Sequence, residues 1–115
     1  MSSIDRITAL QRMLERNPSD PRIHFGLAME YEKLGRWQDV VNVLRTYLDT
    51  ADDEGNAWGR LGNALEQLGL RGEAADAYDR GIAAARAHGH PSMAADFEHI
   101  RTTLRSVDSD PSSHG

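Results

Sequence analysis

The stretch WGRLGNALEQLG, residues 58–69, decides the fold class of this chain. Its three leucines recur at the three- and four-residue intervals that mark one face of a helix. Gly59 and Gly62 lie among these leucines, although a glycine inside a helix costs about 1 kcal/mol relative to alanine. We therefore expect each glycine to allow a close approach, by a neighbouring helix or by a partner.

The chain repeats itself at an interval of 34 residues, which separates the Leu-Gly pair of YEKLGRW (31–37) from that of LEQLGLR (65–71). Ile7, Leu10 and Leu14 align by the same interval with the second half of a repeat, so the chain begins with half a repeat and continues with two whole ones. The interval aligns apolar or small residues throughout: Leu27 with Leu61, Ala28 with Gly62, Tyr31 with Leu65, Val40 with Ala74, Val41 with Ala75, Leu44 with Tyr78, and Leu48 with Ile82.

Glycine, aspartate and proline mark the expected helix ends. Gly35 and Gly69 each follow a leucine that ends an apolar pattern, where a left-handed residue often closes the last turn. Asp20 and Pro21 are typical of an N-cap and of a first helical position. These signals predict an all-α chain with helices at about 4–16, 21–34, 37–50, 55–68, 71–87 and 91–105.

At these positions the sequence resembles the tetratricopeptide repeat (TPR) family, whose pattern is Trp-x2-Leu-Gly-x2-Tyr in the first helix and Ala-x3-Phe in the second. The second repeat matches with Trp58, Leu61, Gly62, Leu65 in place of the tyrosine, Ala74 and Tyr78. The first repeat matches more loosely, with His24, Leu27, Ala28, Tyr31, Val40 and Leu44, and the closing proline occurs only as Pro18. The resemblance implies a right-handed α-solenoid of antiparallel helix hairpins with about six helices, similar to small stand-alone TPR proteins of bacteria.

The resemblance also implies one TPR-like domain over residues 1–106. Its last helix has one apolar stripe, formed by Met93, Ala94, Phe97 and Ile100, and a charged opposite face, as expected where a stack ends. Residues 107–115 lack apolar periodicity and are expected to be a disordered tail. The expected parts are a half-repeat helix at 4–16, repeat one at 21–54, repeat two at 55–88 and a C-terminal capping helix at 91–105.

Composition limits the classes of function. The 115 residues include no cysteine, which excludes disulfide and thiolate chemistry. A net charge of -5 without a basic face argues against nucleic acid as a ligand. The N-terminal residues show no long apolar stretch behind a basic start, and no run of about 18 apolar residues occurs. We therefore expect no signal peptide, a cytoplasmic protein and no membrane partner.

A partner is expected to contact the first helix of each pair, because those helices line the concave side of stacked hairpins. Phe25 and Met29 lie one turn apart and suit an apolar side chain of a peptide, unless the N-terminal helix or the tail covers them. Asn63 and Gln67 offer amides to an extended backbone, or belong to a solvated polar face. The full set outside the core phase is Arg22, Phe25, Met29, Glu32 and Lys33, then Asn56, Gly59, Arg60, Asn63, Glu66 and Gln67, then Glu98 and His99.

The two glycines of the opening stretch receive different interpretations. Gly62 resembles the small family residue at the point where the two helices of one hairpin cross. Gly59 matches no family glycine and is out of phase with the core residues, so we expect it to allow something else to approach closely.

No constellation of residues indicates catalysis, and we expect neither a cofactor nor a metal. His88 and His90 flank Gly89, but no third ligand stands at a fixed spacing. We expect a non-catalytic adaptor or scaffold that binds a peptide or protein segment on the concave face of a short TPR array. The alternative is a structural module whose main partner is itself, as a homodimer with or without helix exchange.

Overall fold

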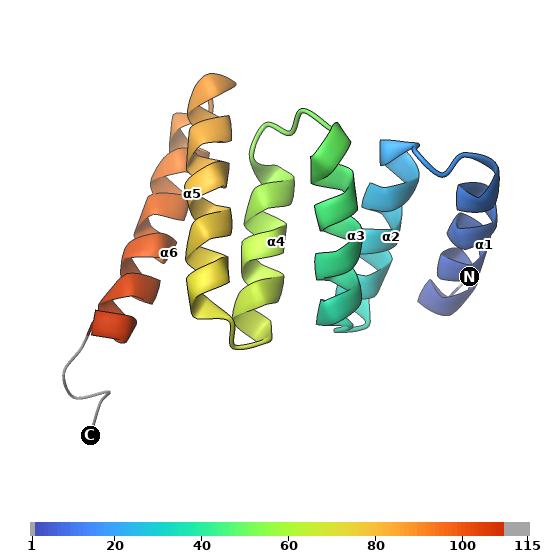
Figure 1. Cartoon of the computed structure of the whole chain (residues 1–115), viewed down its shortest axis with the longest axis horizontal. Helices are drawn as coiled ribbons and strands as arrows, with labels where there is room; N and C mark the ends of the chain where they lie inside the picture. The colour runs from blue at the N-terminus through green and yellow to red at the C-terminus, as the bar shows by residue number, and fades with distance from the viewer. Residues whose placement is uncertain (1, 110–115) are drawn as a thin grey trace. The chain divides into compact units, whose positions relative to one another are not determined.

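The computed structural model describes residues 2–109, and this part of the chain consists of six helices joined by short turns (Figure 1). The predicted all-α fold is confirmed, and the helix bounds agree with the prediction to within a few residues. The last helix extends past the predicted start of the tail at residue 107, and the rest of that tail, 110–115, lies outside the described residues. The helices are α1 (Ser3–Arg16), α2 (Pro21–Lys33), α3 (Trp37–Thr50), α4 (Asn56–Gln67), α5 (Arg71–Ala87) and α6 (Pro91–Ser109).

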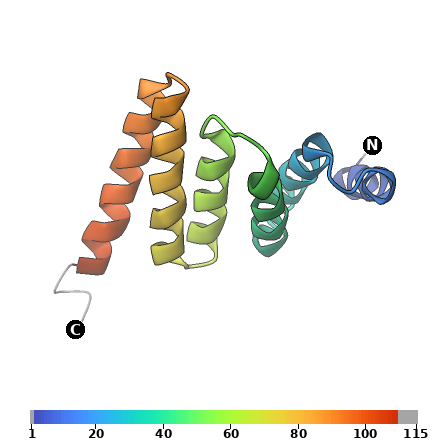
Figure 2. The same cartoon turned by 45° about the horizontal axis from the view of Figure 1, so that its top comes forward.

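These helices form two compact units. Unit 1 ends at Asp52 and contains α1, α2 and α3; unit 2 begins at Asp53 and contains α4, α5 and α6. Within each unit, helices that follow one another in sequence pack side by side as antiparallel neighbours (Figures 1 and 2). Each unit therefore has a core of its own.

The residues aligned by the 34-residue interval form these cores. All fourteen members of the seven aligned pairs are buried except Leu48, which is half-buried. In α1, Ile7 is buried and Leu10 and Leu14 are half-buried, whereas Ile4 is 56% exposed. The repeat register read from the sequence thus identifies the buried positions of both whole repeats.

Glycine closes the helices in the way that the sequence predicts. Gly35 adopts a φ of 67°, and the amide of the next residue, Arg36, donates to the carbonyl of Tyr31 at 3.0 Å. Gly69 adopts a φ of 78°, and the amide after it bonds back to Leu65 at 2.9 Å. These bonds satisfy carbonyl groups of the last helical turn and reverse the chain toward the following helix.

The start of α4 depends on a buried aspartate that is not among the predicted residues. Asp53 is only 6% exposed, and its carboxylate accepts hydrogen bonds from the amides of Gly55 and Ala57, each at 2.9 Å. Ala57 belongs to the first turn of α4, where the amides have no internal acceptors, and Gly55 is the N-cap residue just before it. Burial raises the pKa of Asp53, although the backbone hydrogen bonds act in the opposite direction.

Candidate functional site

The predicted site residues are divided between the two units. The five residues of α2, from Arg22 to Lys33, belong to unit 1, and the residues of α4 and α6 belong to unit 2. Within unit 1 the structure brings Arg22 and Phe25 together in the wall of one cavity.

This cavity lies at the end of unit 1 where α2 begins and α3 ends. Its volume is about 420 Å³, within the range of about 300–1,000 Å³ found for ligand pockets. Because α2 and α3 are antiparallel, the first turn of one meets the last turn of the other at this end. The lining residues are Pro21, Arg22, Phe25, Tyr47, Ala51 and Asp52, and we call this cavity the Phe25 pocket.

Two aromatic rings form much of the wall of the Phe25 pocket. The centroids of Phe25 and Tyr47 are 5.4 Å apart and their planes are inclined by 48°, a favourable tilted arrangement. Both side chains are half-buried. Tyr47 is not among the predicted site residues, because these all come from first helices and Tyr47 lies on the second helix of its pair. One sequence feature could have indicated Tyr47 as a site residue: it lies next to Leu48, at the edge of the apolar stripe of α3.

Arg22 stands at the rim of the pocket, held by the residue that caps α2. The Asp20 carboxylate accepts from the backbone amide of Arg22 at 2.9 Å, and from its guanidinium Nε at 3.3 Å and Nη2 at 3.2 Å. The hydrogen bond from Arg22 lowers the pKa of Asp20, and the same bond raises the pKa of Arg22. The Arg22 side chain is 90% exposed, so its positive charge lies in solvent beside the pocket, where it is paired with the negative charge of Asp20.

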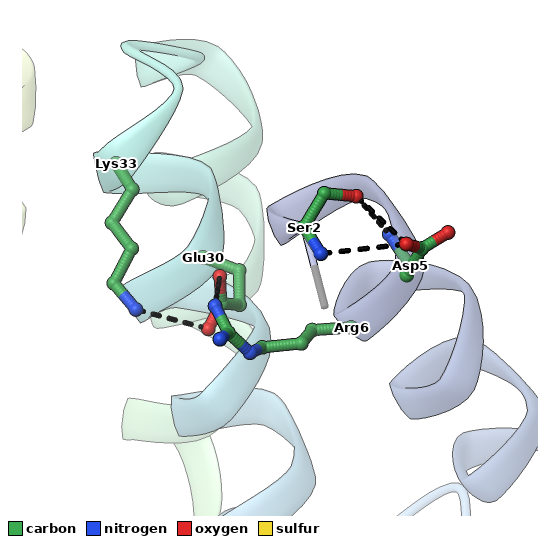
Figure 3. A network of polar contacts seen from close by, with 5 residues as sticks. All are labelled: Ser2, Asp5, Arg6, Glu30 and Lys33. Carbon is green, nitrogen blue, oxygen red and sulfur yellow. Dashed lines mark hydrogen bonds and ion pairs between the residues drawn. The ribbon is translucent and has the colours of Figure 1, made fainter.

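Lys33 belongs to a polar network between α1 and α2 (Figure 3). Its ammonium lies 3.2 Å from Glu30, a carboxylate only 7% exposed, which Arg6 of α1 approaches at 3.7 Å. A hydrogen bond from Ser3, together with Lys33 and Arg6, lowers the pKa of Glu30. The remaining predicted residues of α2, Met29 and Glu32, are half-buried. Arg6 and Glu30 thus help to hold the half-repeat helix against α2, whereas the pair of Lys33 with Glu30 lies within α2.

In unit 2 the predicted site residues Glu66 and Glu98 bond to their own chain. The Tyr78 hydroxyl donates to Glu66 at 2.6 Å, and burial together with this carboxylate raises the pKa of Tyr78. Glu98 of α6 forms an ion pair with Arg86 of α5. The other predicted residues form two groups: Asn63, Gln67 and His99 are exposed, and Asn56 and Arg60 are half-buried.

The residue that approaches Gly59 is Phe97 of α6. A Cβ added to Gly59 would lie 2.4 Å from the Phe97 ring, closer than any real contact. Gly81 of α5 touches the same ring from another side, with 3.0 Å between an added Cβ and the ring. Gly59 therefore lacks a side chain for an internal reason, and it is not part of the site proposed below. Gly62 plays the expected part at the helix crossing, because an added Cβ there would lie 2.8 Å from the Tyr78 ring.

Across residues 2–109 the structure contains no group of three histidine or acidic side chains placed to hold a metal ion. None of the helices in this part of the chain combines the length and the apolar character needed to cross a bilayer.

No protein-family model matches the chain. Among solved structures, protein BPP2914 from Bordetella parapertussis is similar, with a TM-score of 0.73 and 24% identity over 90% of this chain and 91% of that one. A D159K mutant of MamA, a TPR-like protein, is similar with a TM-score of 0.61 and 22% identity over 88% of this chain and 67% of that one. This chain therefore has the fold of a TPR-like helical repeat protein.

Proposed function

We propose that this chain is a non-catalytic interaction module, acting in the cytoplasm, that binds a peptide or protein segment and holds an apolar side chain of that partner in the Phe25 pocket. The observation that supports this proposal is the cavity of about 420 Å³ beside Phe25, an aromatic residue that the repeat phase assigns to a ligand face. Apolar walls with a few polar groups at the rim are typical of sites that take a side chain or a small ligand.

The pocket supplies only part of the binding free energy in this proposal. Full burial of one leucine or phenylalanine side chain contributes about 1.5–3 kcal/mol. A dissociation constant of 1 mM already corresponds to about 4 kcal/mol, so a partner must make further contacts. The exposed residues Asn63, Gln67 and His99 of unit 2 stay candidates for those contacts.

A photo-crosslinking experiment in the source cell tests the proposal. A photoreactive amino acid at position 51, in the pocket wall, should capture a partner in the otherwise wild-type chain. Phe25→Ala should reduce this product several-fold, and Phe25→Leu, which keeps an apolar wall, should retain most of it. The control is the same probe at position 72, where the structure leaves open space on the exposed side of α5.

Two outcomes contradict the proposal. Equal capture from position 51 with and without the Phe25→Ala substitution would show that the pocket does not hold the partner. A product of twice the mass of the chain would show that the bound molecule is a second copy, which supports the homodimer alternative. Circular dichroism of each variant distinguishes loss of binding from loss of the helical fold.

A further inference from the structure

The half-repeat helix α1 leaves apolar side chains open to solvent on one face, with two arginines along the border of that face. We propose that this face binds an amphipathic helix of a partner protein that carries acidic residues beside its apolar stripe. We call the surface the Met13 face, and it shares no residue with the Phe25 pocket. Its members are Ala9, Leu10, Arg12, Met13 and Arg16.

The second repeat shows how a first helix covers such a face. Gly62 of α4 meets the ring of Tyr78 on α5, because a Cβ added to Gly62 would lie 2.8 Å from that ring. Trp58 of α4 packs against Gly81, with 3.1 Å between the Trp58 Cβ and a Cβ added to the glycine. The guanidinium of Arg80 lies 5.4 Å from the centre of the Trp58 ring. Apolar packing and one cation–π contact thus join the two helices.

The helix α1 has the same place in the repeat as α5, two repeat intervals earlier in the chain. The residues of α1 that correspond to those of α5 are Leu10 for Tyr78, Arg12 for Arg80 and Met13 for Gly81. Met13 is 50% exposed, Ala9 and Arg12 are exposed, and Leu10 is half-buried beside α2. The helix α1 therefore presents to solvent the face that α5 buries against α4.

The border of the Met13 face is positively charged. Arg12 and Arg16 lie one turn apart, both are exposed, and neither forms an ion pair within residues 2–109. Glu15 lies almost opposite Met13, because two residues turn a helix by about 200°. Asp5 belongs to the capping box at the other end of α1. Glutamates beside the apolar stripe of a partner helix would therefore be attracted to the two arginines, whereas lysines would be repelled.

Fluorescence anisotropy with three labelled helical peptides of about 18 residues tests this inference. The first has an alanine-rich background, the stripe Trp-x2-Leu-Ala-x2-Leu patterned on α4, and glutamates beside that stripe. The second has lysines in place of the glutamates, and the third has serines in place of the tryptophan and leucines. The whole chain at low salt should bind the first peptide about three- to ten-fold more tightly than the second. It should bind the third most weakly, and added salt should reduce the preference for glutamate.

The net charge of the chain makes this comparison selective. A chain of net charge -5 attracts cationic peptides in general, so the overall charge favours the lysine peptide. A preference for the glutamate peptide must therefore come from a local group of positive charges.

Two pairs of variants locate the bound peptide. Met13→Gln should weaken binding of the glutamate peptide about three- to ten-fold. Ile4→Gln should leave it unchanged, because Ile4 is 56% exposed but lies about two and a half turns away, on the opposite side of α1. Arg12→Gln should weaken binding about two- to five-fold, whereas Arg86→Gln, the same charge change in unit 2, should have little effect. Circular dichroism shows whether each variant keeps its helices.

Several results would overturn the inference. The glutamate peptide could fail to bind, or bind no more tightly than the lysine peptide. Equal effects of Met13→Gln and Ile4→Gln would exclude the Met13 face as the site. A dimer in light scattering that Met13→Gln converts to a monomer would identify a second copy as the occupant instead of a partner helix.

The failure of this inference differs from the failure of the proposed function. Binding of the glutamate peptide that is lost in Phe25→Ala and kept in Met13→Gln would place the peptide in the Phe25 pocket. That result would overturn the inference and leave the proposed function intact. Binding that is lost in Met13→Gln and kept in Phe25→Ala supports the Met13 face as a second, separate surface.

Discussion

At Gly59 helix propensity and packing favour different residues: helix propensity favours alanine, whereas packing requires glycine. It weakens α4 as an isolated helix, and it allows the Phe97 ring to reach the backbone of α4. Gly81 makes room for the same ring from α5, and the ring also lies 5.6 Å from that of Tyr78. Phe97 of α6 is thus held by contacts with both other helices of unit 2.

We predict that Gly59→Ala lowers the free energy of unfolding by about 1–3 kcal/mol, the usual cost of overpacking, although alanine favours the helix. The cause is the 2.4 Å between the added Cβ and the Phe97 ring, which forces the ring to move. Urea unfolding monitored by circular dichroism measures the change. Adding Phe97→Leu to Gly59→Ala should recover part of the loss, because the smaller side chain leaves room for the methyl group.

Gly72→Ala is the matched control for this prediction. Gly72 also lies in a helix, but a Cβ added there has nothing within 4 Å. The variant should be as stable as the wild type or more stable by up to about 1 kcal/mol, because alanine favours the helix without a clash. If Gly59→Ala raised the free energy of unfolding by the same amount as Gly72→Ala, the inference that Gly59 makes room for Phe97 would be wrong.

At the scale of helices, α6 is attached to α5 by charge as well as by apolar packing. The carboxylate of Asp79 on α5 accepts from Arg101 at 2.8 Å and from Arg105 at 2.6 Å, both on α6. Partial burial acts to raise the pKa of Asp79, but the two arginines outweigh it and lower the pKa below its ordinary value. The carboxylate is 37% exposed, so solvent weakens the attraction.

This ion pair gives a prediction for stability as a function of pH. Because the pKa of Asp79 is lower in the folded chain than in the unfolded one, its contribution is fully present above about pH 4 and is lost as the pH falls through the folded value. Asp79→Asn should therefore destabilise the chain by about 0.5–1 kcal/mol at pH 7 and by much less near pH 2. Urea unfolding of both chains at the two pH values measures this difference.

Asp96→Asn serves as the control, because Asp96 is an exposed carboxylate of α6. Its effect on stability should be small at both pH values. An Asp79→Asn chain as stable as the wild type at pH 7 would show that the two arginines contribute nothing measurable to the attachment of α6.

The sequence predicts the helices well because their signals are local. The bonds that close the turns at Gly35 and Gly69 span only a few residues, and the repeat interval places the core residues on the same helix faces. The contact of Phe97 with Gly59 joins residues far apart in the sequence, and no short pattern predicts it. The role of Asp53 could not be predicted, because nothing in the sequence distinguishes it from the acidic residues on either side. Only the structure shows that its carboxylate is buried and accepts hydrogen bonds from two amides.

At the scale of the whole molecule, the candidate site is predicted only in part. The repeat phase selects Arg22 and Phe25, which the structure places in one pocket. The same reasoning omits Tyr47, Ala51 and Asp52, because a pocket at paired helix ends takes its second wall from the returning helix. The concave face that would join residues of α2 and α4 stays a prediction, since these helices belong to different units.

Nuclear magnetic resonance can show directly whether an apolar side chain binds in the Phe25 pocket of the whole chain. Amide chemical shifts of the ¹⁵N-labelled protein should be followed during titration with N-acetylphenylalaninamide, in the wild type and in Phe25→Ala. We expect the largest shifts at the residues that line the pocket, and we expect these shifts to be lost in the variant: Arg22, Phe25, Tyr47, Ala51 and Asp52. Largest shifts in α4, α5 or α6, or the same shifts with and without the Phe25 ring, would contradict this expectation.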